Sequence, residues 1–342
     1  GAPDAVDIIV RVPGRVEIEH VAHALDVEAA RGDIRGDDDL VLGHRFKRLE
    51  RGHQVGQADV DPQINQHIDQ RVVALDLAEM HQPGEHFVIT QPEHARLSGF
   101  LADHWGGGDF VRSEPWDEVC LAAAEHDNGW REWDDRPSLN PEGAPAYMYE
   151  NPIAEIFKIL QRGVGRLIDR GHPYAAALIS LHYVNWATDV LTGVRSGQWP
   201  VTPRLRAEIE VFKAEEEERR DAVCRRLREQ PGFEEAATPE GIRRNGRLVW
   251  TFDMLSLIVC CRWPHIKSLR AVPSGDGFGT LAVELVDDVT LRVNPWPFDG
   301  NALEFAVQGR RLPPKPFHRA SDFWDVLNRV PGSEIVFQFA PV

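Results

Sequence analysis

The segment from Arg247 to Arg262 constrains the fold of this chain more than any other part of the sequence. It reads RLVWTFDMLSLIVCCR, and Asp253 carries the only charge between the two arginines. A segment this long and this apolar is expected to form a helix buried inside the protein. Burying a lone carboxylate is costly unless the group is paired or coordinates a metal. We therefore expect Asp253 to have a partner in the core.

Most of the preceding 160 residues are expected to be helical as well. Thr90-Gln91-Pro92-Glu93 resembles a capping box, and Thr202-Pro203 and Thr238-Pro239 are typical helix starts. The helices predicted from these signals and from the apolar spacing run from Thr90 to Trp105, from Pro115 to Asp127, and over 152–170, 173–192, 203–229 and 239–262.

After Pro264 the periodicity changes to that of short strands separated by Gly, Pro and Asp. We expect an antiparallel sheet of three to five strands, with one helix between the last two strands. The predicted strands are Thr280–Leu285, Val289–Val293, Leu303–Val307 and Glu334–Phe339, and the helix is Asp322–Arg329 with Ser321 as its cap. The fold class is therefore mainly α with a C-terminal α+β part.

Three regions follow from these patterns: 1–86, a helical domain 87–264 and a small β domain 265–342. Residues 1–86 contain no Ser, Thr, Tyr, Trp or Cys. Ordinary loops use Ser and Thr for turns and caps, so this segment is expected to be disordered or not native, for example an extended reading frame with its true start at Met80. A genuine acidic module is the alternative.

Residues 121–133, LAAAEHDNGWREW, carry the strongest chemical signal. A small apolar helix delivers Glu125, His126 and Asp127 in a row and then breaks at Asn128-Gly129. Adjacent His and Asp at a helix end offer a nitrogen and an oxygen donor to one metal ion. The alternative is that Asp127 turns the chain out of the helix and His126 lies on the surface.

Other potential donors occur along the helical region. His94 precedes His126 by 32 residues, and Asp253 follows much later. Two imidazoles and two carboxylates suit Zn, Mn, Fe or Ni. Asp127 could bridge two ions, with His182 as the additional ligand; a core histidine with one hydrogen bond is the alternative for His182. Glu125 is a candidate to orient a metal-bound water or a ligand imidazole.

This H…HD…D order resembles the HD-domain metal-dependent phosphohydrolases. The resemblance implies an HD-like helical bundle and a metal-bound water as the nucleophile. Over about residues 87–342 the chain also resembles the bacterial family of domain of unknown function 3891. That resemblance rests on VITQPEHARLSGFLADHW, AAAEHDNGWREWD, LISLHY, WTFDMLSLIVCCRW and VNPWPFDG, and it implies no established activity.

Composition excludes several classes of function. The formal net charge of -16 argues against nucleic acid and anionic membranes as partners. No apolar run approaches the roughly 20 residues needed to cross a bilayer, and no secretory signal is visible. The four cysteines lack zinc or redox spacing, so a cytoplasmic protein with reduced thiols is expected.

Taken together, the patterns predict a metal-dependent hydrolase acting on a small phosphorylated molecule, with catalytic roles for Glu125 and Asp127. Two alternatives remain open. One is a non-catalytic module that binds an apolar or aromatic molecule in a pocket lined by Trp105, Trp130, Trp133 and Trp186; the last three are also the substrate-contact candidates of the hydrolase. The other is an iron or haem oxygenase-like protein that uses His182 with Glu216. The oligomeric state stays open.

Overall fold

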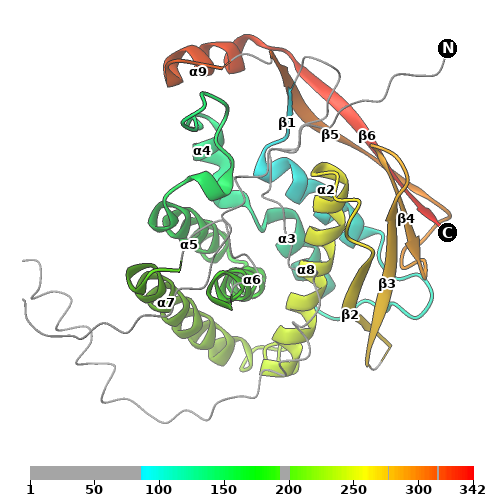
Figure 1. The fold of residues 1–342 in the computed structure, drawn as a ribbon. Helices are drawn as coiled ribbons and strands as arrows, with labels where there is room; N and C mark the ends of the chain where they lie inside the picture. The colour runs from blue at the N-terminus through cyan, green and yellow to red at the C-terminus, as the bar shows by residue number, and fades with distance from the viewer. Residues whose placement is uncertain (1–85, 193–200, 276, 314–315) are drawn as a thin grey trace, which may run out of the picture. The chain divides into compact units, whose positions relative to one another are not determined.

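A computed structural model describes residues 86–192, 201–275, 277–313 and 316–342, about half of them helical (Figure 1). The longer helices are α2 (Gln91–Asp103), α3 (Trp116–Glu125), α5 (Ile153–Asp169), α6 (Pro173–Thr192), α7 (Pro203–Leu227), α8 (Pro239–Cys260) and α9 (Ala320–Arg329). Short helical turns are η1 (Asn128–Trp130), α4 (Arg131–Asp134) and η2 (Met148–Glu150). Among the described helices, none has the length and apolar character needed to span a membrane.

The helix starts follow local signals at two of the four predicted caps. The hydroxyl oxygens of Thr202 and Thr238 each accept a backbone N–H in the first turn, at 3.1 Å. The capping box predicted at Thr90 is wrong, because the Thr90 side chain makes no cap hydrogen bond. The Glu93 carboxylate instead pairs with Arg96 and accepts the backbone N–H of Gln308 from the sheet. A tertiary contact has taken the place of the local one.

The sheet has six strands in the order β1-β5-β6-β4-β3-β2. Its strands are β1 (His86–Val88), β2 (Ser268–Ser274), β3 (Gly277–Leu285), β4 (Thr290–Asn294), β5 (Leu303–Leu312) and β6 (Gly332–Pro341). The predicted antiparallel sheet is wrong in two respects. β4 and β6 pair in parallel, because the chain returns through β5 and α9 rather than a hairpin. β1 and β2 were not predicted, and β1 reaches β5 from before the first helix.

The predicted C-terminal helix begins two residues earlier than expected. Its N-cap is Arg319, with no side-chain cap bond, and the Ser321 hydroxyl lies next to the Asp322 carboxylate instead. The capping role predicted for Ser321 is therefore wrong.

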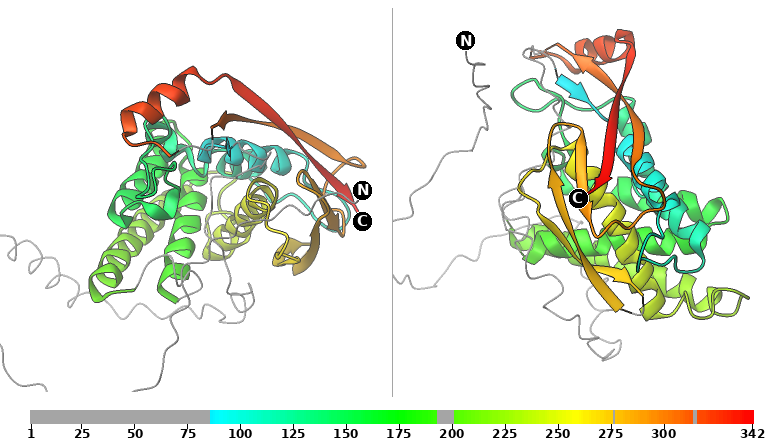
Figure 2. Two further views of the ribbon diagram at one scale, coloured as in Figure 1. Left: turned by 45° about the horizontal axis from the view of Figure 1, so that its top comes forward. Right: turned by 90° about the vertical axis from the view of Figure 1, so that its right-hand side faces the viewer.

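Helices α2 and α8 connect the sheet to the other helices. Both contact strands, α2 at β5 and α8 at β2, while α3 and α6 pack on α8 from the side away from the sheet. Figure 1 shows α8 between the sheet and the group α5, α6 and α7, and Figure 2 shows the sheet curling over α2 and α8. The main hydrophobic core runs through helices and sheet, and a small second cluster of Leu312, Phe323 and Leu327 lies at α9 and β5. All described residues belong to one compact unit. The predictions for 1–86 lie outside the described residues, apart from His86 in β1.

Candidate metal centre

The HDNGW motif makes a tight exit from α3. The Asn128 side-chain amide donates to the carbonyl of Glu125 at 2.9 Å and so satisfies the end of the helix. At Gly129, an added Cβ would lie 2.1 Å from the backbone oxygen of Ile159 in α5. Only glycine therefore allows this turn to pack so closely on α5. Trp130 is fully buried behind it. The motif holds His126 and Asp127 at a defined point between helices.

Close contact between α2 and α3 brings the first two histidines together. A Cβ added at Gly99 of α2 would lie 2.5 Å from the Cβ of Ala124 in α3. His94, one turn earlier on α2, then faces the end of α3. The ring centroids of His94 and His126 are 5.0 Å apart.

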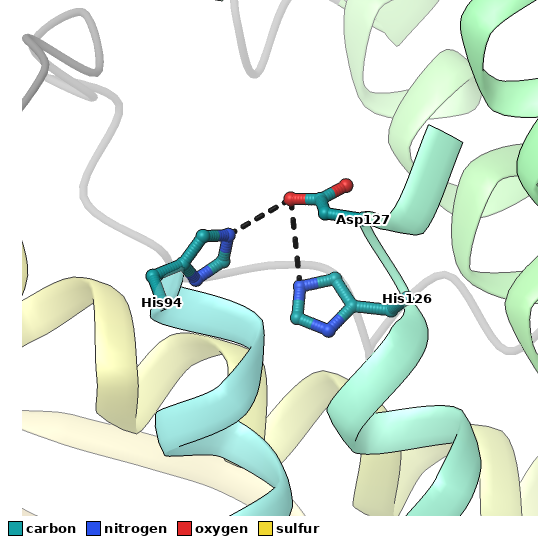
Figure 3. Close-up of side chains that lie close together, drawn as sticks. All are labelled: His94, His126 and Asp127. Atoms are coloured by element: carbon teal, nitrogen blue, oxygen red, sulfur yellow. Dashed lines mark hydrogen bonds and ion pairs between the residues drawn. The ribbon is translucent and has the colours of Figure 1, made fainter. Parts of the chain in front are cut away.

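Asp127 lies between these two rings (Figure 3). Its Oδ2 is 2.8 Å from Nε2 of His94 and 3.6 Å from Nε2 of His126. One donor atom from each of these three residues lies within 4.8 Å of the others, and all three side chains are buried. One small cation could contact all three.

Asp253 of α8 adds a second carboxylate next to these residues. Its Oδ1 is 3.2 Å from Nε2 of His126 and 3.8 Å from Nδ1 of His94. Its Oδ2 is 3.6 Å from Nε2 of His182, near the middle of α6. The structure thus brings together all five predicted metal-ligand candidates, from α2, the end of α3, α6 and α8.

Hydrogen bonds on the outer side of two rings decide which nitrogens face inwards. Nδ1 of His126 lies 2.8 Å from the carbonyl oxygen of Ala123, which can only accept, so Nδ1 carries the proton. The Ser256 hydroxyl donates to the Asp253 carbonyl at 2.8 Å. Its oxygen is then left to accept a proton from Nδ1 of His94, 3.1 Å away.

Both Nε2 atoms face carboxylate oxygens, which can only accept, and Nε2 of His94 is hydrogen-bonded to Oδ2 of Asp127 at 2.8 Å. Nε2 of His126 is buried and has no hydrogen-bond partner among the described residues. Lone pairs that face carboxylates repel unless a positive charge, a proton or a metal ion, lies between them.

The pKa values of His126 and Asp253 also indicate that a positive charge is favourable in the cluster. Burial by itself lowers the pKa of His126, but the carboxylates of Asp127 and Asp253 outweigh it and raise this pKa to about 9. Burial raises the pKa of Asp253, yet His126 and the neighbouring histidines hold it well below its usual value. Asp253 is therefore a carboxylate, ready to act as an oxygen ligand.

The cluster forms the base of a pocket between α2, α6 and α8. Its cavity volume is about 60 Å³, and one water needs roughly 10–15 Å³ on this measure, so the enclosed part holds a few waters or one small chemical group. The pocket is partly open, and a larger ligand would extend beyond the enclosed part. The lining residues are Gln91, His94, His126, Asp127, Met148, Leu160, His182, Tyr183, Asn185, Trp186, Asp189, Trp250, Asp253, Met254 and Leu257.

Comparison with known proteins places the chain in one family. The family model described as "Protein of unknown function (DUF3891)" matches residues 80–314. The chain belongs to this family. No curated protein and no solved structure matches it. Of the cluster, His94, His126, Asp127, His182 and Asp253 all lie within the matched part of this DUF3891 chain.

The other predicted site residues have different surroundings. The Glu125 carboxylate pairs with Arg131 at 3.2 Å and Arg170 at 3.5 Å, and Glu125 does not line the pocket. Trp186 does line it. Trp130 is fully buried in the core, and Trp133 packs edge-on against it and lines a separate cavity.

Two residues named only in the alternative functions also lie elsewhere. Trp105 is buried between helix and sheet, where it contacts Phe252 and Phe298. Glu216 is fully buried and pairs with Arg219 at 3.0 Å, and it does not line the pocket that His182 lines.

Sequence reasoning missed the residue that orients His94. Ser256 lies three residues after Asp253, on the same face of α8, and i to i+3 spacing was the available signal. Trp250, Met254 and Asp189 were also missed as pocket residues. Asp189 lies about two turns beyond His182 on α6, and the apolar composition of α6 does not reveal from the sequence which face meets the pocket.

Proposed function

We propose that this DUF3891 chain is a metal-dependent hydrolase with an HD-like arrangement of ligands. One observation carries the proposal: two imidazoles, each with its Nδ1 next to an oxygen on the outer side, turn their Nε2 atoms towards two buried carboxylates. A divalent cation could replace the protons between these nitrogen and oxygen atoms and bind all four groups. The mixed N/O donor set suits Zn, Mn, Fe or Ni.

His94, His126, Asp127 and Asp253 would hold the ion, and His182 would contact a second ion or the substrate. A bound metal would supply a water of lowered pKa and would polarise a phosphoryl oxygen. The residues around the proposed ligands orient the imidazoles and limit the access of water. Ser256 and the Ala123 carbonyl keep the imidazoles turned inwards, and the surrounding core excludes bulk water from the carboxylates.

Metal analysis of full-length protein purified without a His tag tests the proposal. We expect about one or two divalent ions per chain, lost in His126→Ala and Asp253→Asn. His318→Ala is the matched control, because His318 is exposed and far along the chain from the cluster. The loaded protein should then release inorganic phosphate from a phosphomonoester.

Other outcomes favour the other classes of function. Metal-free protein whose variants fold normally contradicts the hydrolase and supports a non-catalytic binding module. A visible absorption band from iron or haem would support an oxygenase-like protein.

A further inference from the structure

The wall of the pocket above the cluster is apolar and aromatic. Side chains of three kinds form it: thioethers, leucines and indoles, namely Met148, Met254, Leu160, Leu257, Trp186 and Trp250. Met148, Met254 and both leucines are buried, and Trp186 is only 8% exposed. Thioethers and aromatic rings make favourable contacts with aromatic groups. This wall is suited to the hydrocarbon part of a ligand.

The charged side chains that line the pocket are all acidic. Asp127, Asp189 and Asp253 line it, and within the described part of the chain no Lys or Arg does. Arg247 is close, with its guanidinium 3.5 Å from the centre of the Trp250 ring. However, its Nε donates to the Ala271 carbonyl at 3.1 Å, and its charge is offset by that of Asp189, which opposes the lowering of the Arg247 pKa by burial.

A polyphosphate chain would therefore find no cation in this pocket other than ions bound at its base. Protein sites for phosphates ordinarily supply Arg, Lys or a row of backbone N–H groups. A single phosphoryl group contacting the ions meets no such difficulty, and its organic part would lie against the apolar wall.

We propose that the substrate is a phosphomonoester of an apolar or aromatic alcohol, and that nucleoside triphosphates and pyrophosphate are excluded. This inference rests on the hydrolase proposed above. In the reaction, a water oxygen forms a bond to phosphorus as the ester P–O bond breaks. The leaving alkoxide takes a proton that derives from that water, and the products are the alcohol and inorganic phosphate.

Three probes test the inference on the full chain: 1-naphthyl phosphate, ATP and 1-naphthol. Binding of 1-naphthyl phosphate and ATP is measured by calorimetry with Mn²⁺-loaded protein, and binding of 1-naphthol is measured with metal-free protein. The release of inorganic phosphate is followed for 1-naphthyl phosphate and ATP. We expect 1-naphthyl phosphate to bind and to be hydrolysed, and ATP to bind at least tenfold more weakly. Trp186→Leu should weaken 1-naphthol binding by about two- to tenfold, the loss of one aromatic contact.

Two further variants keep the test independent of folding. Trp324→Leu is the matched control, because Trp324 is a half-buried tryptophan on α9 whose indole N–H donates to Pro137 and which does not line the pocket; it should leave all three affinities unchanged. Asp189→Lys adds a cation to the lining and should tighten ATP binding by roughly two- to fivefold.

The failure of each proposal has its own signature. ATP that binds as tightly as 1-naphthyl phosphate, or 1-naphthol that does not bind, overturns the inferred substrate class, and metal-dependent release of phosphate in the same assay leaves the hydrolase supported. Protein that binds 1-naphthol through Trp186 but binds no metal and hydrolyses neither phosphate contradicts the hydrolase, and it leaves the preference for an apolar group supported as a binding property.

Discussion

Ser256→Ala tests the central physical argument without touching a proposed ligand. The Ser256 oxygen is 3.1 Å from Nδ1 of His94, and the residue is fully buried. Once the hydroxyl is removed, this hydrogen bond is lost, and Oδ1 of Asp253 at 3.8 Å is beyond hydrogen-bond distance. The ring would then be free to turn, and Nε2 would no longer be held towards Oδ2 of Asp127.

The expected magnitudes differ for stability and for metal binding. Loss of a typical hydrogen bond lowers the free energy of unfolding by about 0.5–1.5 kcal/mol. Removal of a group that orients a metal-bound histidine typically weakens metal affinity by about 10–100-fold, which is about 1.4–2.8 kcal/mol of binding free energy. The metal affinity should therefore change more than the stability of the metal-free protein.

Competition with a chelating dye gives the metal affinity, and urea unfolding of metal-free protein gives the stability. Ser180→Ala is the matched control, since Ser180 is a buried helical serine whose hydroxyl donates to the carbonyl of Glu216 rather than to the cluster. It should lose stability but no metal affinity. If Ser256→Ala also binds the metal within about twofold of the original chain, the reasoning about oriented imidazoles is refuted.

Two further predictions concern packing and pH. Gly129→Ala should destabilise the fold by about 1–3 kcal/mol or more, because its Cβ would meet the Ile159 carbonyl. The control is Gly165→Ala on α5, whose Cβ would meet nothing within 4 Å and which should stabilise the fold by about 0.5–1 kcal/mol. Equal effects of the two substitutions in urea unfolding would contradict this. Burial raises the pKa of Glu216 above its ordinary 4.5 despite the opposing effect of Arg219, so the folded state favours the neutral acid and stability falls as pH rises through that range. The stability of Glu216→Gln relative to the original chain should accordingly increase between about pH 4 and 7, and a difference that does not vary with pH would show that the carboxyl is not destabilised by burial.

Most helices of this chain could be predicted because their signals are local. Thr202 and Thr238 cap the helices that follow them, as their sequences indicate. Thr90 carries the same kind of signal and fails, because the sheet offers Glu93 a backbone N–H that competes with the capping box. Strand pairing was predicted less well, since β1 and β5 meet across most of the described chain and no local pattern records such a partner.

The sequence by itself determined which residues are the candidates for the proposed metal site. A lone carboxylate in an apolar helix needs a partner, whatever the rest of the chain does. Likewise, Asn128-Gly129 ends the helix directly after His126-Asp127, so these two side chains lie at a helix end. Only the tertiary structure decided that His94, His126, His182 and the two aspartates meet, and that Glu125 turns away to Arg131 and Arg170. The physical reason is that the positions of these side chains depend on how closely the helices pack, above all at Gly99 and Gly129. Helix packing depends on contacts between residues that are far apart in the sequence.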